Sequence, residues 1–167
     1  MKKYHLFVPK QAVGANLVYF DLFNNSADNI ELDHVIPVVS GAVAVTGVLG
    51  VDLFLTYTSA VGTGGTAATR DGTDITAATF TKLNNKGDPM RSEITARLTP
   101  TGGATAGGII SMVSVFTEET GGGTYSGQLS DLLADDKVII APGFGIRVIQ
   151  GAVASVGNIA FIVGIQL

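Results

Sequence analysis

The stretch that decides the fold is KVIIAPGFGIRVIQGAVASVGNIAFIVGIQL, residues 137–167. After Lys137 it contains one charged residue, Arg147, and residues 148–167 contain none. An uncharged segment of this length is compatible with a membrane anchor, a nucleotide-binding loop or the closing strands of a sheet. The spacing of its large side chains distinguishes between these three interpretations.

The spacing favours strands. In residues 158–167 the large apolar side chains recur at every second position, as Ile159, Phe161, Val163, Ile165 and Leu167. This is the period of a strand with one buried face. The break APGFG precedes a similar strand, and SVGN at residues 155–158 is typical of a tight turn. The segment is therefore expected to end in a β-hairpin.

The two other interpretations are weaker. Residues 148–167 include Gln150, Asn158, Gln166 and three glycines, which disfavours a membrane-spanning helix. The best match to a dinucleotide-binding loop is GTGGTA at residues 62–67. Such a loop must open a helix that holds the phosphates, and the sequence that follows is rich in threonine and β-branched residues. We expect a flexible loop there.

Short strands separated by turn residues continue along the whole chain, at residues 4–9, 16–23, 30–39, 50–59, 77–83, 92–100, 108–118, 137–141 with 145–152, and 158–167. About eight or nine strands without alternating helices predict an all-β chain, a single-domain antiparallel sandwich or barrel spanning residues 1–167. Residues 1–10 are either an N-terminal arm or the first strand. One short helix is expected near residues 129–135, where Leu129, Leu132 and Leu133 share a face.

One uncharged segment allows two interpretations. Residues 35–51 are predicted to form either a hairpin that turns near Ser40 or an interface loop packed on a neighbour. The strand pattern also predicts the buried core, namely Phe20, Phe54, Leu98, Val113, Val115, Ile146, Val148, Phe161 and Val163.

Composition limits the possible partners. Of 167 residues only 14% are charged, whereas globular proteins have about 25%, and 46% are hydrophobic. Such a surface is expected to be covered in part by other copies of the chain or by a partner. The net charge of −4 and the scattered cations argue against nucleic-acid binding. Pro9 and Lys10 interrupt the N-terminal apolar stretch, so no secretory signal is expected and synthesis in a cytoplasm follows.

No catalytic, cofactor-binding or metal-binding residues are expected. The two histidines are His5 and His34, and there is no cysteine. Glu31 and Asp33 neighbour His34, but strand alternation would place His34 on the opposite face. No Gly-x-Ser-x-Gly motif occurs, and the paired carboxylates are sequence neighbours without an environment that separates their pKa values. The chain is therefore not expected to be an enzyme.

The glycine-, alanine- and threonine-rich chain that ends in IIAPGFGIRVIQGAVASVGNIAFIVGIQL resembles the closing strands of a jelly roll. In this pattern, mainly over residues 92–167, it is similar to capsid decoration (cement) and minor structural proteins of tailed bacteriophages, and to tumour-necrosis-factor-like trimer domains. The resemblance implies a homotrimer on the capsid surface of a virion that braces the major capsid protein. It implies no cofactor, no nucleic acid and no membrane.

Candidate contact residues lie in the N-terminal segment, the uncharged segment 35–51 and a glycine-rich loop, and they are Tyr4, His5, Phe7, Val43, Val45, Val48 and Tyr125. The alternative function is a receptor- or carbohydrate-binding module of a tail fibre or head spike. Sugar sites commonly use exposed aromatic residues, and the chain has no tryptophan and four tyrosines. Tyr125 is the one tyrosine predicted to lie in a loop.

Overall fold

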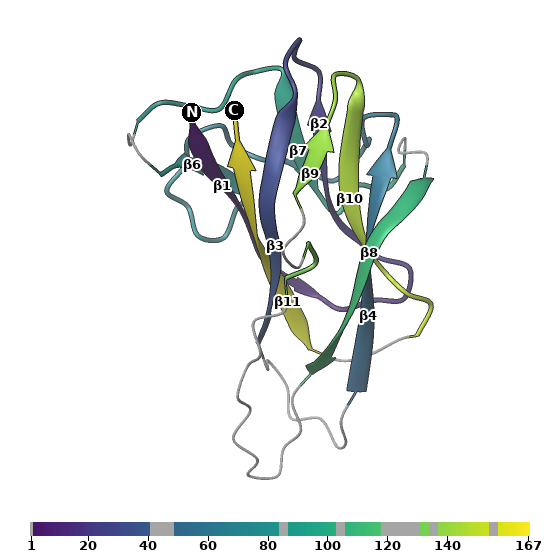
Figure 1. Cartoon of the computed structure of the whole chain (residues 1–167). Coiled ribbons are helices and arrows are strands. Elements are labelled where there is room, and N and C mark those ends of the chain that lie inside the picture. Colours follow the sequence, from purple (N-terminus) through teal and green to yellow (C-terminus); the bar gives the residue numbers. More distant parts are fainter. Residues whose placement is uncertain are drawn as a thin grey trace.

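Two antiparallel sheets lie face to face in the structure, a computed structural model that describes residues 2–40, 49–83, 87–102, 106–117, 131–133, 137–153 and 157–167 (Figure 1). The five-stranded sheet has the order β6 (Thr79–Lys82), β1 (Lys3–Ala12), β11 (Asn158–Gln166), β3 (Ile30–Ser40), β9 (Val138–Ile140). The six-stranded sheet has the order β5 (Thr66–Ala67), β7 (Ile94–Leu98), β2 (Val18–Asn24), β10 (Phe144–Gln150), β4 (Leu49–Thr58), β8 (Ala106–Thr117). The predicted all-β sandwich is confirmed.

The strands pair in a nested order. β1 pairs with β11, β2 with β10, β3 with β9, and β4 with β8, all antiparallel. Further pairings join these four pairs into two sheets, because β11 also pairs with β3 and β10 also pairs with β4. The resulting orders β1-β11-β3-β9 and β2-β10-β4-β8 are those of a jelly roll. The remaining strands, β5 to β7, extend the sheets from the connection between β4 and β8.

The core fills the space between the sheets. Phe161 of β11 is completely buried, and its ring centroid lies 5.2 Å from that of Tyr19 and 5.4 Å from that of Phe20, both on β2. A register shift between β2 and β10 at Tyr19 allows Tyr19 and Phe20, although adjacent, both to be buried against Phe161. These aromatic contacts join the two sheets at their centre.

A short turn closes one side of the core. Residues 131–133 bring Leu132 and Leu133 into the core, where each is 3% exposed. The Asp131 carboxylate accepts the backbone N–H groups of Val35 and Leu133, and the Leu132 N–H donates to the Val35 carbonyl. Ser111 of β8 donates its hydroxyl to the Leu132 carbonyl. The turn therefore bridges β3 of one sheet and β8 of the other.

The predicted C-terminal hairpin is wrong. β10 and β11 are the predicted strands, but they lie in different sheets and do not pair with each other. Alternation reveals which face of a strand is buried, and both strands bury a face in the same core. It does not reveal which strand lies alongside.

The same distinction applies to residues 35–51. β3 continues to Ser40 in one sheet and β4 begins at Leu49 in the other, so these two strands do not form a hairpin with each other. Residues 41–48, which include the candidate contacts Val43, Val45 and Val48, lie outside the described residues. At the N-terminus the chain forms β1 between β6 and β11, so of the two alternatives the first strand is observed and the arm is not.

Two further expectations need correction. Residues 131–133 form a turn rather than a helix, and the rest of 129–135 is not described. Six of the nine predicted core side chains are buried, while Leu98 and Val113 are half-buried at the margin of the core. Phe54 lies on the opposite side of β4 from buried Leu53 and Leu55, and it packs over Gly151. Within the described part of the chain, no helix is long and apolar enough to cross a membrane.

Replacing Phe161 with alanine is expected to lower the free energy of unfolding by about 3–5 kcal/mol, because it leaves a cavity between the two sheets. The matched control is Phe144→Ala, since Phe144 is 48% exposed and its loss is expected to cost less than about 1 kcal/mol. Urea unfolding followed by circular dichroism measures both. Equal losses for the two variants would contradict the burial of Phe161.

Candidate functional site

The outer surface of the five-stranded sheet is largely uncharged at its centre. The core-facing side chains of β1 alternate with His5 and Phe7, which therefore point outward. Cross-strand register extends this surface in two rows, one through His5, Gly164 and His34, the other through Phe7, Ile162 and Ile36. Five half-buried side chains form what we call the histidine face: His5, Phe7, His34, Ile36 and Ile162.

A glycine allows the two histidines to meet. His5 on β1 and His34 on β3 are separated by β11, and both are opposite Gly164. A Cβ atom at Gly164 would lie 2.4 Å from Cε1 of His34, which is closer than any side chain allows. The imidazole of His34 occupies this space, and its ring centroid lies 5.0 Å from that of His5 in an edge-to-face arrangement.

This environment favours the neutral form of His5. Burial lowers the pKa of His5 below its ordinary value of 6.5, and the neighbouring His34 lowers it further, while Asp33 opposes the shift. Because the unfolded chain binds this proton at higher pH than the folded chain, His5 contributes stability above about pH 6.5 that is lost on acidification. The histidine face thus couples protonation to folding.

A charged row borders the histidine face at one end. The register between β3 and β11 shifts at Asp33, which puts Asp33 and His34 on the same side of the sheet. The alternation-based placement of His34 opposite the acidic residues is therefore wrong. Lys3 lies 3.9 Å from the Asp33 carboxylate, and Lys137 forms an ion pair with Glu31. Both charge signs are present in this row.

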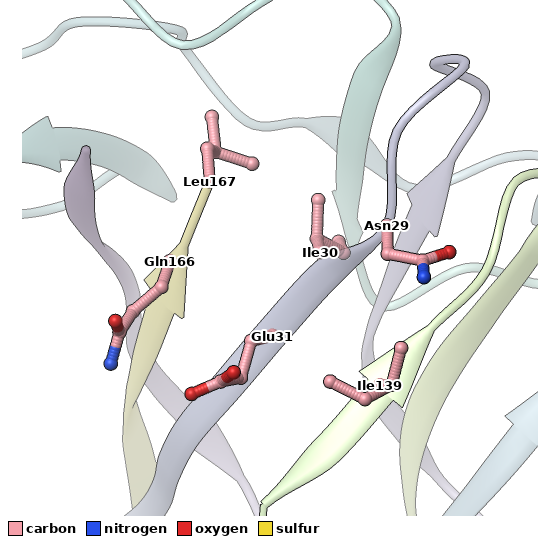
Figure 2. A pocket seen from close by; sticks show the side chains of 6 residues that line it. All are labelled: Asn29, Ile30, Glu31, Ile139, Gln166 and Leu167. Atoms are coloured by element: carbon pink, nitrogen blue, oxygen red, sulfur yellow. The ribbon is translucent and has the colours of Figure 1, made fainter. Parts of the chain in front are cut away.

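The charged row leads into a shallow hollow of about 340 Å³ (Figure 2). Its lining residues come from the start of β3, the middle of β9 and the end of β11: Asn29, Ile30, Glu31, Ile139, Gln166 and Leu167. The amide of Gln166 donates to Asp33 and the carboxylate of Glu31 pairs with Lys137, so both polar groups already have partners. Across the described residues, no group of three or more histidine, cysteine, aspartate or glutamate side chains is arranged to hold a metal ion.

A second hollow, of about 370 Å³, lies where the edges of the two sheets approach each other. It is lined by Tyr57, Thr58, Ser59, Gly107, Gly108, Ile139, Ala141 and Phe144. Ile139 is 47% exposed and Phe144 is 48% exposed. None of these described lining residues carries a charge, so they offer apolar contact rather than acid–base chemistry.

The six-stranded sheet buries a carboxylate on its outer face. Asp21 of β2 is 1% exposed and lies opposite Arg97 of β7 and Arg147 of β10. Its Oδ1 accepts the backbone N–H of Arg97 at 2.9 Å. Its Oδ2 is buried and accepts no hydrogen bond from the described residues, although the Gly62 backbone lies beside it. Burial raises the pKa of Asp21, against the lowering effect of the Gly62 and Arg97 groups.

The glycine-rich stretch at residues 62–67 covers this carboxylate. A Cβ atom at Gly62 would lie 1.8 Å from Oδ2 of Asp21, so the loop can approach β2 because Gly62 has no side chain. Arg97 donates from its guanidinium to the Gly64 carbonyl at 2.9 Å. The stretch then enters the short strand β5 rather than a helix. The glycines serve packing against the sheet, and a phosphate-binding geometry is not formed.

The predicted contact residues do not lie on one surface. Tyr4 is 1% exposed and faces the core, so it does not belong to an interaction surface. His5 and Phe7 are half-buried parts of the histidine face. Val43, Val45, Val48 and Tyr125 lie outside the described residues.

Sequence reasoning missed the pairing of the two histidines and the burial of Asp21. Alternation does place His5 beside Phe7 on one face, but it cannot reveal that Gly164 lies between the histidines. A signal for Asp21 was available: it is the one charged residue in the apolar strand VYFDLFN, where a carboxylate must be covered or paired.

No family model matches this chain, and no curated protein or solved structure matches it either.

Replacing His34 with glutamine is expected to raise the pKa of His5 toward its ordinary value, because the neighbouring imidazolium charge is removed. The measurement is an NMR titration of the His5 imidazole. Lys10→Gln is the control, since Lys10 is an exposed cation on the same strand and its loss should leave the His5 titration unchanged. A His5 pKa that stays the same or falls in the His34 variant would contradict the observed proximity.

Replacing Asp21 with asparagine is expected to change how stability depends on pH. The raised pKa of Asp21 means that its contribution is present below its unfolded value of 3.8 and is lost as pH rises through the folded value. The unfolding free energy of the wild type should therefore fall relative to that of Asp21→Asn as pH rises from 3 toward neutrality. Urea unfolding across this range measures the difference.

The control for this titration is Asp74→Asn. Hydrogen bonds from Thr76 lower the pKa of exposed Asp74, so the wild type should gain stability relative to this variant over the same pH rise. Parallel curves for the wild type and Asp21→Asn would show that Asp21 titrates as it does in the unfolded chain.

Proposed function

We propose that this chain is a non-enzymatic structural protein of a virion, a capsid decoration (cement) protein. It associates with itself as a trimer and binds the major capsid protein on the outer surface of a phage head. The observation that carries the proposal is the number of large apolar side chains left uncovered on a sparsely charged jelly roll. Among them are Ile75, Val153, Ile109 and Met112, which are 80%, 67%, 66% and 56% exposed.

Single exposed apolar side chains are common on protein surfaces, but here several occur on a chain with a low fraction of charged residues. Surfaces of this kind are stable in water when another protein surface covers them. A symmetric oligomer seated on a shell covers surface twice, once between copies and once against the shell. The jelly roll is also a recurrent architecture of viral capsid domains.

The alternative module, which binds a receptor or a carbohydrate, is less well supported. Jelly rolls also occur in lectins, where exposed aromatic rings stack on sugars. Of the tyrosines in the described residues, Tyr4 and Tyr19 are buried and Tyr57 is half-buried. The uncovered side chains on the described surface are mostly aliphatic, which suits contact with protein rather than with sugar.

Light scattering behind a sizing column tests the oligomer. A mass that is a multiple of three 17.1-kDa chains is expected at micromolar concentration. A single chain at every concentration would remove the trimer from the proposal. The virion role is tested directly with particles of a tailed phage that encodes the chain.

Particles of that phage made without the chain are expected to assemble but to release their DNA at a lower temperature than complete particles. Adding the purified chain should restore the higher temperature, and the chain should be found on the restored heads. Heads that assemble and melt identically with and without the chain would contradict the decoration role.

A further inference from the structure

One of the sheet edges is long, and no strand among the described residues pairs with its outer side. The two sheets have four edge strands, and three of them are short: β5 has two residues, β6 has four and β9 has three. The fourth, β8, has 12 residues and spans roughly 40 Å at about 3.4 Å per residue. Within the described part of the chain, β8 pairs with β4 on one side and has no strand on its other side.

β8 also lacks most of the features that protect exposed edges. Charged side chains and prolines commonly block the pairing of an edge with another chain, and the sequence AGGIISMVSVFT contains neither. Two register shifts distort residues 106–110, but residues 111–117 pair regularly with β4. Among the described residues, no backbone group outside β4 bonds to the backbone of this regular part, and Met112 is exposed beside it.

We propose that residues 111–117 of β8 pair antiparallel with the same residues of a second copy about a two-fold axis. The contact would join two six-stranded sheets into one continuous sheet. A two-fold contact requires a surface that is complementary to itself. β8 meets this requirement because it carries no charge, so antiparallel pairing with its own copy places no like charges opposite each other.

Both faces of β8 support a second copy as the occupant. On the inner face, Val113 is half-buried at the margin of the core and Val115 is 7% exposed. A second copy would place its own Val113 and Val115 beside them and extend the apolar layer. On the outer face, Met112 would lie beside apolar or hydroxyl side chains of the same strand, with Asp52 already bonded to Ser114. Pairing uses the edge of both copies, so the β8 contact by itself joins two copies and no more.

This contact does not rest on the proposed virion role or on the trimer. A two-fold contact through β8 makes pairs, so it doubles whatever unit forms through other surfaces. It would join two monomers into a dimer, or two trimers into a hexamer, and the two cases differ in mass. The two proposals can therefore fail separately.

The test is the mass in solution of the variant Met112→Lys with Ser114→Lys. Both side chains are exposed, so the fold should tolerate the changes, while four lysines would meet across the two-fold axis. Thr66→Lys with Ala67→Lys is the matched control, because it adds the same charge at two exposed positions of β5, the strand at the opposite edge of the same sheet. Circular dichroism checks that both variants are folded.

Halving of the mass in the β8 variant, with the control unchanged, is the expected result. A fall from six copies to three supports both the β8 contact and the trimer, and a fall from two to one supports the β8 contact alone. A mass that is the same in the wild type, the β8 variant and the control would overturn the β8 contact, even if that mass is three copies.

Hydrogen–deuterium exchange of the wild-type chain provides a test that needs no variant. The amides of residues 111–117 are expected to exchange slowly at high protein concentration and faster on dilution, because the second copy protects them. The amides of β11, which lie inside a sheet, should exchange at the same rate at both concentrations. Concentration-independent exchange in β8 would overturn the proposal.

Discussion

The pairing of β1 with β11 is the contact on which the rest of the structure depends. It joins residues at opposite ends of the chain, from Lys3 opposite Gln166 to Ala12 opposite Asn158, and backbone hydrogen bonds between Lys2 and Leu167 continue it. The pairs of β2 with β10, β3 with β9 and β4 with β8 are nested inside this outermost pair along the chain. Figure 1 shows the consequence, with both ends of the chain side by side at one end of the sandwich. Closing such long loops is entropically costly, and the shared core offsets that cost.

Sequence periodicity predicted the all-β class and most of the strands, because a strand in a two-layer sandwich must bury every second side chain. It identified buried Phe161, Val163, Ile146 and Val148 on that basis. The C-terminal hairpin failed for the same physical reason, since two strands that bury a face in one core have the same pattern whether or not they are neighbours. The choice of Phe54 as a core residue was wrong because it followed side-chain size rather than alternation. Val51, Leu53 and Leu55 share the buried face of β4, and Phe54 lies on the other face with Asp52.

The surface features depend on long-range register, which the local sequence does not encode. His5 and His34 meet because Gly164 lies between them and because a register shift at Asp33 places His34 on the outer face. Asp21 is buried because Gly62, 41 positions later, allows a loop to cover it. From the local sequence, a glycine predicts a turn. Gly62 and Gly164 instead leave space for a side chain from another strand. The uncovered edge of β8 likewise follows from the order of strands in its sheet.

The most direct test of the nested topology is an NMR measurement of cross-strand contacts around β10. The jelly roll predicts backbone nuclear Overhauser effects from Val148 to Phe20 on β2 and to Leu55 on β4. It also predicts contacts from Phe161 to Val8 on β1 and to Pro37 on β3. A ladder of backbone contacts between β10 and β11, as in a hairpin, would contradict the nested order and the fold built on it.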